Sequence, residues 1–182
     1  DDWKVYSSGL PDASKSIRLD QTGSYDNDTT SWNSTTPTSS VFTVGTSSAT
    51  NTNDSTYIAY SFTDVAGYSK FGSYTGNGDA DGTFVYTGFK PAFIMYKKSS
   101  GTGRWTMEDN KRDPFNVATH GLEANGSSAE NTGSNYWDVD LVSNGFKFRT
   151  TEQETNQSGQ TFIYMSFGQS LVGSNNVPCT AR

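Results

Sequence analysis

The chain has 182 residues, and its formal net charge of −6 excludes a surface built to follow a nucleic-acid backbone, which requires clustered positive charge. No segment approaches the roughly 20 consecutive apolar residues that cross a bilayer, so we expect no membrane insertion. The single cysteine, Cys179, allows no internal disulfide and no cysteine-rich zinc site. Stability must therefore come from packing, from turns or from neighbouring chains.

The composition predicts an all-β protein with a thin, aromatic core. Eighteen glycines and long runs of Ser, Thr, Asn and Asp are typical of short strands joined by polar turns, whereas helix-forming residues are sparse. Eleven Phe, ten Tyr and four Trp supply large side chains for the core. The length suits one sandwich or two small units, and we favour two units that share a core.

In chain order, the first predicted strands are apolar runs at residues 3–6, 41–44 and 56–62, with Trp32 between the first two. The last of these runs is apolar on both faces, so we expect a central strand that is buried on both sides.

The same landmarks recur later in the same order. Their spacing is kept to within about three residues, which tandem duplication explains better than chance similarity between short strands. The second set consists of residues 105–108, Trp137, residues 146–148 and residues 161–167.

A block at residues 71–98 precedes the second set and has no counterpart before Trp3. It holds three predicted strands, at residues 71–74, 83–86 and 91–97. An incomplete sheet has an open edge, which must be paired or it invites aggregation.

We place the boundary between the two units near residue 66, where Gly67 begins a connector. Residues 1–66 then form a partial first unit that lacks its opening strands, and residues 67–182 form a nearly complete second unit. This asymmetry predicts either a longer protein upstream of residue 1 or strands supplied by a partner. Residues 178–182, in contrast, read as a natural end.

The second half predicts a hairpin between residues 137 and 149. Apolar residues and the carboxylates Asp138 and Asp140 alternate, as expected for a half-solvated antiparallel strand, and a Ser-Asn-Gly turn follows at residues 143–145. Residues 93–96 and 162–167 are predicted to be buried central strands. A short helix is expected only within residues 113–124, and polar loops are expected at residues 22–36, 45–55, 99–103, 125–135 and 151–159.

The loop at residues 76–82 carries the candidate metal ligands. Asn77, Asp79 and Asp81 occupy the first, third and fifth places of a calcium loop, but the twelfth place is Gly88 where a bidentate Glu is needed. A Gly- and Asp-rich hairpin loop is the favoured interpretation, with calcium as an alternative.

A glycosidase-like acid pair could be drawn from Asp138 and Asp140, or from Glu108 and Asp109, but alternating carboxylates on a wet strand face are the commoner cause of this pattern. The single histidine, His120, lies in a predicted loop and is interpreted as a surface or packing residue. We therefore expect no catalytic residues.

Aromatic side chains are the candidates for ligand binding. The four tryptophans recur at matching places in both halves, which favours core packing over sugar stacking. Three tyrosines in polar loops are better candidates for an exposed glycan platform: Tyr25, Tyr68 and Tyr136.

Several strings together resemble one family. They are residues 71–78 (FGSYTGNG), 87–93 (TGFKPAF), 104–105 (RW), 143–147 (SNGFK) and 161–164 (TFIY), with 32–33 (WN), 41–45 (VFTVG) and 57–60 (YIAY) in the first half. The order of these strings is similar to the repeat module of uncharacterised, tail-fibre-like or structural virion proteins of tailed bacteriophages, often of marine bacteria. The resemblance implies a concanavalin- or SPRY-like antiparallel β-sandwich with a jelly-roll-like arrangement, and it supplies no catalytic residues.

We therefore expect a non-enzymatic virion surface protein that acts by assembly with copies of itself or other virion proteins and by contact with a host receptor. The alternatives are a glycan-binding module and a capsid decoration protein.

Overall fold

The computed structural model describes residues 2–133 and 135–169, so Cys179 and residues 178–182 lie outside the described residues. Strands dominate, in agreement with the all-β prediction. Among these residues, no helix is long and apolar enough to span a bilayer. The elements are β1 (Lys4–Val5), β2 (Lys15–Arg18), β3 (Asp26–Asn27), α1 (Ser48–Asn51), β4 (Ser69–Thr75), β5 (Phe84–Tyr86), β6 (Pro91–Lys98), β7 (Trp105–Asp109), β8 (Leu122–Glu123), β9 (Val139–Val142), β10 (Gly145–Phe148), α2 (Gln153–Asn156) and β11 (Thr161–Gly168).

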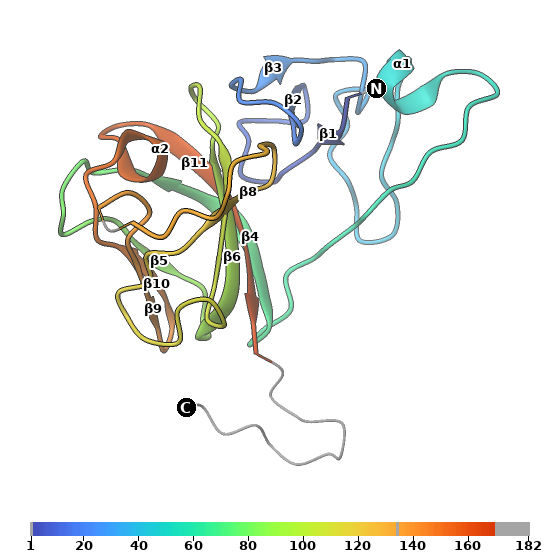
Figure 1. Ribbon diagram of the computed structural model, residues 1–182. Coiled ribbons are helices and arrows are strands. Elements are labelled where there is room, and N and C mark those ends of the chain that lie inside the picture. Colours follow the sequence, from blue (N-terminus) through green and yellow to red (C-terminus); the bar gives the residue numbers. More distant parts are fainter. Residues whose placement is uncertain (1, 134, 170–182) are drawn as a thin grey trace.

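The described strands form three antiparallel sheets (Figure 1). The largest has five strands in the order β4-β11-β6-β7-β8, and the others have the orders β5-β10-β9 and β1-β2-β3. The block at residues 71–98 supplies β4, β5 and β6, as predicted. Its two flanking strands, β4 and β6, enclose β11 on both sides.

The main core lies between the five-stranded sheet and the β5-β10-β9 sheet. Tyr74 stacks on Phe162 with ring centroids 4.8 Å apart, and Tyr96 meets Phe148 edge-on at 5.2 Å. Such aromatic pairs add about 0.5–1.5 kcal/mol each beyond the burial of their area. The core residues are Tyr74, Val85, Ile94, Tyr96, Ala118, Val139, Leu141, Phe146, Phe148, Phe162 and Tyr164.

A second apolar cluster covers the other face of the five-stranded sheet. Met95, Trp105 and Ile163 point to this face and contact Leu10 and Ile17 from the first part of the chain. The alternation of Ile94 and Met95 between the two clusters follows from the two-residue period of a strand. β6 and β11 are therefore buried on both faces, which confirms the prediction for residues 93–96 and 162–167.

Polar contacts fix the N-terminal residues to the same sheet. The Trp105 indole N–H donates to the Arg18 carbonyl at 2.8 Å, and the Tyr25 amide donates to the Ser99 carbonyl at 3.0 Å. The buried Lys97 ammonium donates to the carbonyl oxygen of Thr22 at 3.1 Å. These bonds join β2 and the loop after it to the ends of β6 and β7.

The predicted hairpin of β9 and β10 is confirmed, with Val142 opposite Gly145 across the two-residue turn. The half-solvated face predicted for β9 is wrong, because Asp138 and Asp140 are each only 8% exposed. Arg149 lies across this face, and its Nε donates to Asp140 Oδ2 at 2.6 Å. Asp138 Oδ1 accepts a hydrogen bond from the Asn135 amide at 2.7 Å, so both carboxylates have partners within the protein.

Gly145 allows β10 to approach β5. A Cβ atom on Gly145 would lie 2.1 Å from the carbonyl oxygen of Val85, a distance that no real contact reaches. We predict that Gly145→Ala lowers the free energy of unfolding by about 1–3 kcal/mol, the usual cost of overpacking. Chemical denaturation would measure this loss. Gly23→Ala is the matched control, because a Cβ there meets nothing within 4 Å and should change stability by less than about 0.5 kcal/mol. Equal stability of the two variants would contradict the prediction.

The strands predicted at residues 41–44 and 56–62 are absent from the described structure, and both segments are largely exposed. In the second half, β10 pairs with β5 and β9, and β11 pairs with β4 and β6. Segments without such neighbours cannot satisfy a strand's backbone groups, whatever their β-propensity. The helix expected within residues 113–124 is also absent, whereas the single turns α1 and α2 and the short β3 occur in segments predicted to be loops.

Candidate functional site

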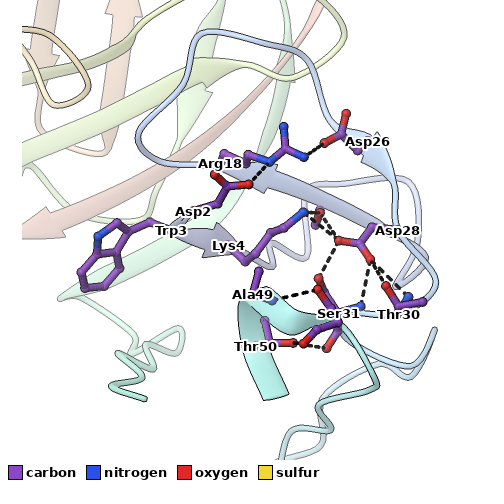
Figure 2. Close-up of polar contacts among 12 residues, drawn as sticks. Asp2, Trp3, Lys4, Arg18, Asp26, Asp28, Thr30, Ser31, Ala49 and Thr50 are labelled. Carbon is purple, nitrogen blue, oxygen red and sulfur yellow. Dashed lines mark hydrogen bonds and ion pairs between the residues drawn. The ribbon is translucent and has the colours of Figure 1, made fainter. Parts of the chain in front are cut away.

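A cluster of polar side chains around Asp28 holds the β1-β2-β3 sheet together (Figure 2). Asp28 Oδ2 accepts hydrogen bonds from Lys4 Nζ at 2.9 Å, from Ser16 Oγ at 2.8 Å and from Ser31 Oγ at 2.6 Å. Oδ1 accepts from the backbone amides of Thr30, at 3.2 Å, and Ser31, at 2.8 Å. The amide contacts are the local turn that Asp forms with the residues two and three positions later.

These contacts set the charge state of Asp28. Burial alone would raise the pKa of the Asp28 carboxyl, but the hydrogen bonds from Ser31, Lys4 and Ser16 outweigh it and hold the pKa well below its usual range. The Lys4 side chain is only 8% exposed, so each of the two charges depends on the other. The cluster therefore links β1, β2 and the turn after β3.

An open polar hollow of about 400 Å³ lies beside this cluster, lined in part by Lys4, Arg18 and Asp26. Arg18 forms ion pairs at 2.9 Å with both Asp2 and Asp26. Because both cations of the hollow already have carboxylate partners, the arrangement is suited to holding the sheet together. It offers hydrogen-bonding groups to a polar ligand but no acid and base held apart for catalysis.

The second candidate surface consists of two apolar segments, residues 41–44 and 56–62, which we call the unpaired segments. Seven of their large side chains are exposed: Val41, Phe42, Val44, Tyr57, Ile58, Tyr60 and Phe62. Within the described part of the chain, no backbone N–H or C=O group of residues 56–62 makes a hydrogen bond to another backbone group. Figure 1 shows this stretch as an extended connection between α1 and β4.

Aromatic contacts hold the C-terminal part of residues 56–62. Trp3 stacks on Tyr60 with centroids 6.2 Å apart and planes inclined by 22°, and Phe62 meets Phe167 at 5.8 Å. In Figure 2 the Trp3 ring points away from the side on which Lys4 meets Asp28. The core-packing prediction holds for Trp105 and Trp137, and it is wrong for Trp3, which is half exposed. Trp32 is partly buried and packs edge-on against Tyr6 at 6.2 Å.

The three predicted tyrosines do not form one platform. Tyr25 is partly buried against the second apolar cluster, close to Ser99 at the end of β6. Tyr136 is also partly buried, and its hydroxyl accepts a hydrogen bond from Arg104 at 3.2 Å. Tyr68 is exposed and meets Phe167, near the opposite ends of β6 and β11. Of the three, only Tyr68 has the exposure that a glycan platform needs.

The loop at residues 76–82 uses its candidate calcium ligands within the protein. Asn77 Oδ1 accepts from the Asp79 amide at 3.0 Å, and Asp79 Oδ1 accepts from the Asp81 amide at 2.8 Å. Asp81 forms ion pairs with Lys147 at 2.9 Å and Arg149 at 3.1 Å. These side-chain contacts with backbone amides are typical of turns, which explains why Asn and Asp occur at every second position of the loop. The positive charges of Lys147 and Arg149 beside Asp81 oppose the binding of a calcium ion.

Glu108 is a buried acid that sequence reasoning considered only as half of a pair. Its side chain is fully buried, and Oε1 accepts a hydrogen bond from the Tyr96 hydroxyl at 2.8 Å. Burial raises the pKa of the Glu108 carboxyl well above its usual range; Asp138 and Asp113 act in the same direction, and the Tyr96 hydrogen bond offsets part of the effect. Its sequence neighbour Asp109 instead pairs with Arg112 at 2.9 Å.

We predict that Glu108→Gln makes the protein more stable than the parent at pH 8. Because the folded-state pKa of Glu108 lies above the unfolded value of about 4.3, its contribution to stability is complete below that value and is lost as pH rises through the folded pKa. At pH 4 the two proteins should differ by less than about 1 kcal/mol, since both side chains are then uncharged. Denaturant titrations at both pH values measure this, with the exposed Glu130→Gln as control. A parent and variant with parallel pH profiles would contradict the prediction.

His120 is part of a loop contact. Its Nδ1 lies 2.6 Å from Asp113 Oδ1. Asp113 Oδ2 accepts hydrogen bonds from the backbone amides of Thr119, at 2.6 Å, and His120, at 2.7 Å. Burial would raise the pKa of Asp113, but these hydrogen bonds outweigh it and hold the pKa below its usual value. The pair thus closes the loop after β7, in line with a packing role for His120.

One family model matches nearly the whole chain. The family model described as a domain of unknown function, DUF7483, matches residues 1–170. The chain belongs to the DUF7483 family. No curated protein and no solved structure shows significant similarity to it. The DUF7483 match extends across both halves of the chain, including both unpaired segments.

Sequence reasoning missed the Asp28 cluster and the contact between Trp3 and Tyr60. The Asp28 turn had a local signal, because Asp followed by Thr and Ser is typical of such turns. Its partner Lys4 lies 24 positions away, and that pairing has no signal in the sequence.

Proposed function

We propose that this DUF7483 domain is a non-enzymatic structural module of a virion surface, in a tail-fibre-like or related appendage. It acts by assembly with copies of itself or other virion proteins and by contact with a host surface glycan or protein. The observation that carries the proposal is the exposure of the unpaired segments, where Val41, Ile58 and Tyr60 are each more than 60% exposed. Large exposed apolar surfaces are typical of protein interaction sites.

The resemblance of residues 71–78 and 161–164 to virion repeat modules supports the virion location in this proposal. A sandwich built of two related tandem units, jelly-roll-like in its connections, is the finer fold that we propose. Two observations support it: two sheets enclose the main core, and the Trp3 and Trp105 runs both form strands that pair with the strand after them.

The proposal is tested by the location and oligomeric state of the full-length protein. Mass spectrometry and antibody labelling of purified particles should find it on the tail, and native mass spectrometry should find a symmetric oligomer, with a trimer expected for a fibre. Labelling on the capsid shell would favour the decoration protein instead. A protein that is absent from particles and monomeric at high concentration would refute the proposal.

A glycan-binding module is the second candidate, and the half-exposed stack of Trp3 on Tyr60 favours it. Aromatic faces of this kind bind sugar rings by apolar contact. A glycan array should then give a signal that Trp3→Ala removes, whereas Tyr25→Ala should leave it intact because Tyr25 is partly buried. A blank array with the unaltered protein counts against this candidate.

A further inference from the structure

Residues 56–62 have the sequence of a sheet strand but lie outside every sheet of the described structure. Thr, Ile, Ser and Phe occur at the same places in this segment and in residues 161–167 of β11. Ile163 in β11 is 2% exposed, whereas its counterpart Ile58 is 71% exposed. The two segments therefore share a pattern and differ in whether strands flank them.

β11 has a hydrogen-bonded strand on each of its sides. Ile163 lies opposite Ser73 of β4 and opposite Lys97 of β6, and both pairings are antiparallel. β6 pairs in turn with β7, which begins at Trp105. One strand, β6, thus separates β11 from β7.

In the first half of the chain, a ring contact joins the segments that correspond to the two outer members of this arrangement. β1 begins directly after Trp3 and pairs with β2 along one edge, and no described strand pairs with its other edge. Trp3 stacks on Tyr60, so β1 and residues 56–62 meet where the second half has β6 between their counterparts. Two strands with a third between them are about 10 Å apart, so an inserted strand must separate these two rings.

We infer that residues 56–62 accept an added β-strand, which pairs antiparallel with them and with β1. The added strand is an extended segment of the β6 kind, apolar on both faces, carried by a different module of the same family, because β6 of this chain is already paired along both edges. It continues the β1-β2-β3 sheet and pairs with backbone groups along one edge of residues 56–62. Strand addition of this type obtains affinity from main-chain hydrogen bonds and specificity from alternate side chains. The inference rests on the proposed assembly function.

The outer edge of β4 is a poorer acceptor for the same strand. Its first residue, Ser69, already exchanges hydrogen bonds with Val65, and the Asp64 carboxylate accepts the amide of Phe71 at 2.9 Å. Asp64 also forms an ion pair with Lys70. A charged pair at a strand edge is a common means of blocking further pairing.

The experiment combines the full-length chain with a peptide that has the sequence of residues 91–98 and follows hydrogen exchange at single amides. Saturating peptide should slow exchange at residues 57–62 by about tenfold or more, the protection expected of paired strand amides. Tryptophan fluorescence should change as Trp3 leaves Tyr60, and Trp3→Ala should lose that change but keep the protection. The peptide with Ile94→Pro, which lacks one N–H and breaks the ladder, should give neither effect.

The other outcomes overturn the inference. Protection at residues 69–75 would place the peptide on the β4 edge, and no protection anywhere would show that residues 56–62 do not accept a strand. Concentration-dependent protection of residues 57–62 without peptide would make the occupant a second copy of this chain. The proposed function fails separately: a chain that binds the peptide but is absent from particles refutes the function alone, and a particle protein that ignores the peptide refutes only this inference.

Discussion

Asp28→Ala should lower the free energy of unfolding of the β1-β2-β3 sheet by about 3–5 kcal/mol, the usual cost of removing one partner of a buried ion pair. The change leaves the Lys4 ammonium buried without its carboxylate and frees the amides of Thr30 and Ser31. Hydrogen exchange should accelerate in β1 and β2, and thermal denaturation should shift to lower temperature.

The effect of Asp28 should depend on pH in a defined direction. Since its folded-state pKa lies below the unfolded value of about 3.9, its contribution is complete above that value and is lost as pH falls toward the folded pKa. The parent should therefore lose its advantage over Asp28→Ala in acid. Asp26→Ala is the control, because this partly exposed partner of Arg18 should cost no more than about 1 kcal/mol. If both variants have the same stability at pH 7, the central role of Asp28 is wrong.

Ile163→Ala should destabilise the protein by about 2–5 kcal/mol, as large-to-small changes do in a core. Ile58→Ala, at the matching place in the first half, should change stability by less than about 0.5 kcal/mol, as for a surface position. The difference follows from exposure alone, because the residue type and the neighbouring pattern are the same. Denaturant titration of the two variants at low protein concentration measures it.

A large loss for Ile58→Ala would mean that this side chain is buried in solution, and the unpaired segments would then not be an exposed surface. Ile58→Val is a further control that keeps the β-branched shape. It should behave as the parent in stability and in any assembly assay.

Strands could be predicted where the block at residues 71–98 supplies the strands that pair with them. β4, β5 and β6 lie in the predicted block, and β11 pairs with two of them, so propensity and pairing agree. At residues 57–62 the same propensity predicted a buried central strand, and the structure gives an exposed segment. Propensity is a property of the segment, but strand formation also needs a partner, which a local pattern cannot reveal.

Candidate site residues were less predictable for a related reason. Loop composition singled out Tyr25 and Tyr136, yet contacts with β6 and Arg104 partly bury them. Alternation did not predict that Asp138 and Asp140 are buried, with Asp138 bonded by the Asn135 amide and Asp140 paired with Arg149. Such contacts join residues that are distant in the sequence or lie on another strand.

The second apolar cluster contains residues from both sides of the predicted domain boundary near residue 66. Leu10 and Ile17 precede residue 66, and they cover Met95, Trp105 and Ile163, which follow it. A polypeptide cut at residue 66 would keep every strand of the five-stranded sheet but present one of that sheet's faces to water, where it would favour aggregation. The place where the sequence pattern restarts is thus not a place where the chain can be divided into parts that fold alone. The predicted boundary near residue 66 therefore lies within one packed unit that includes described residues from both sides of it.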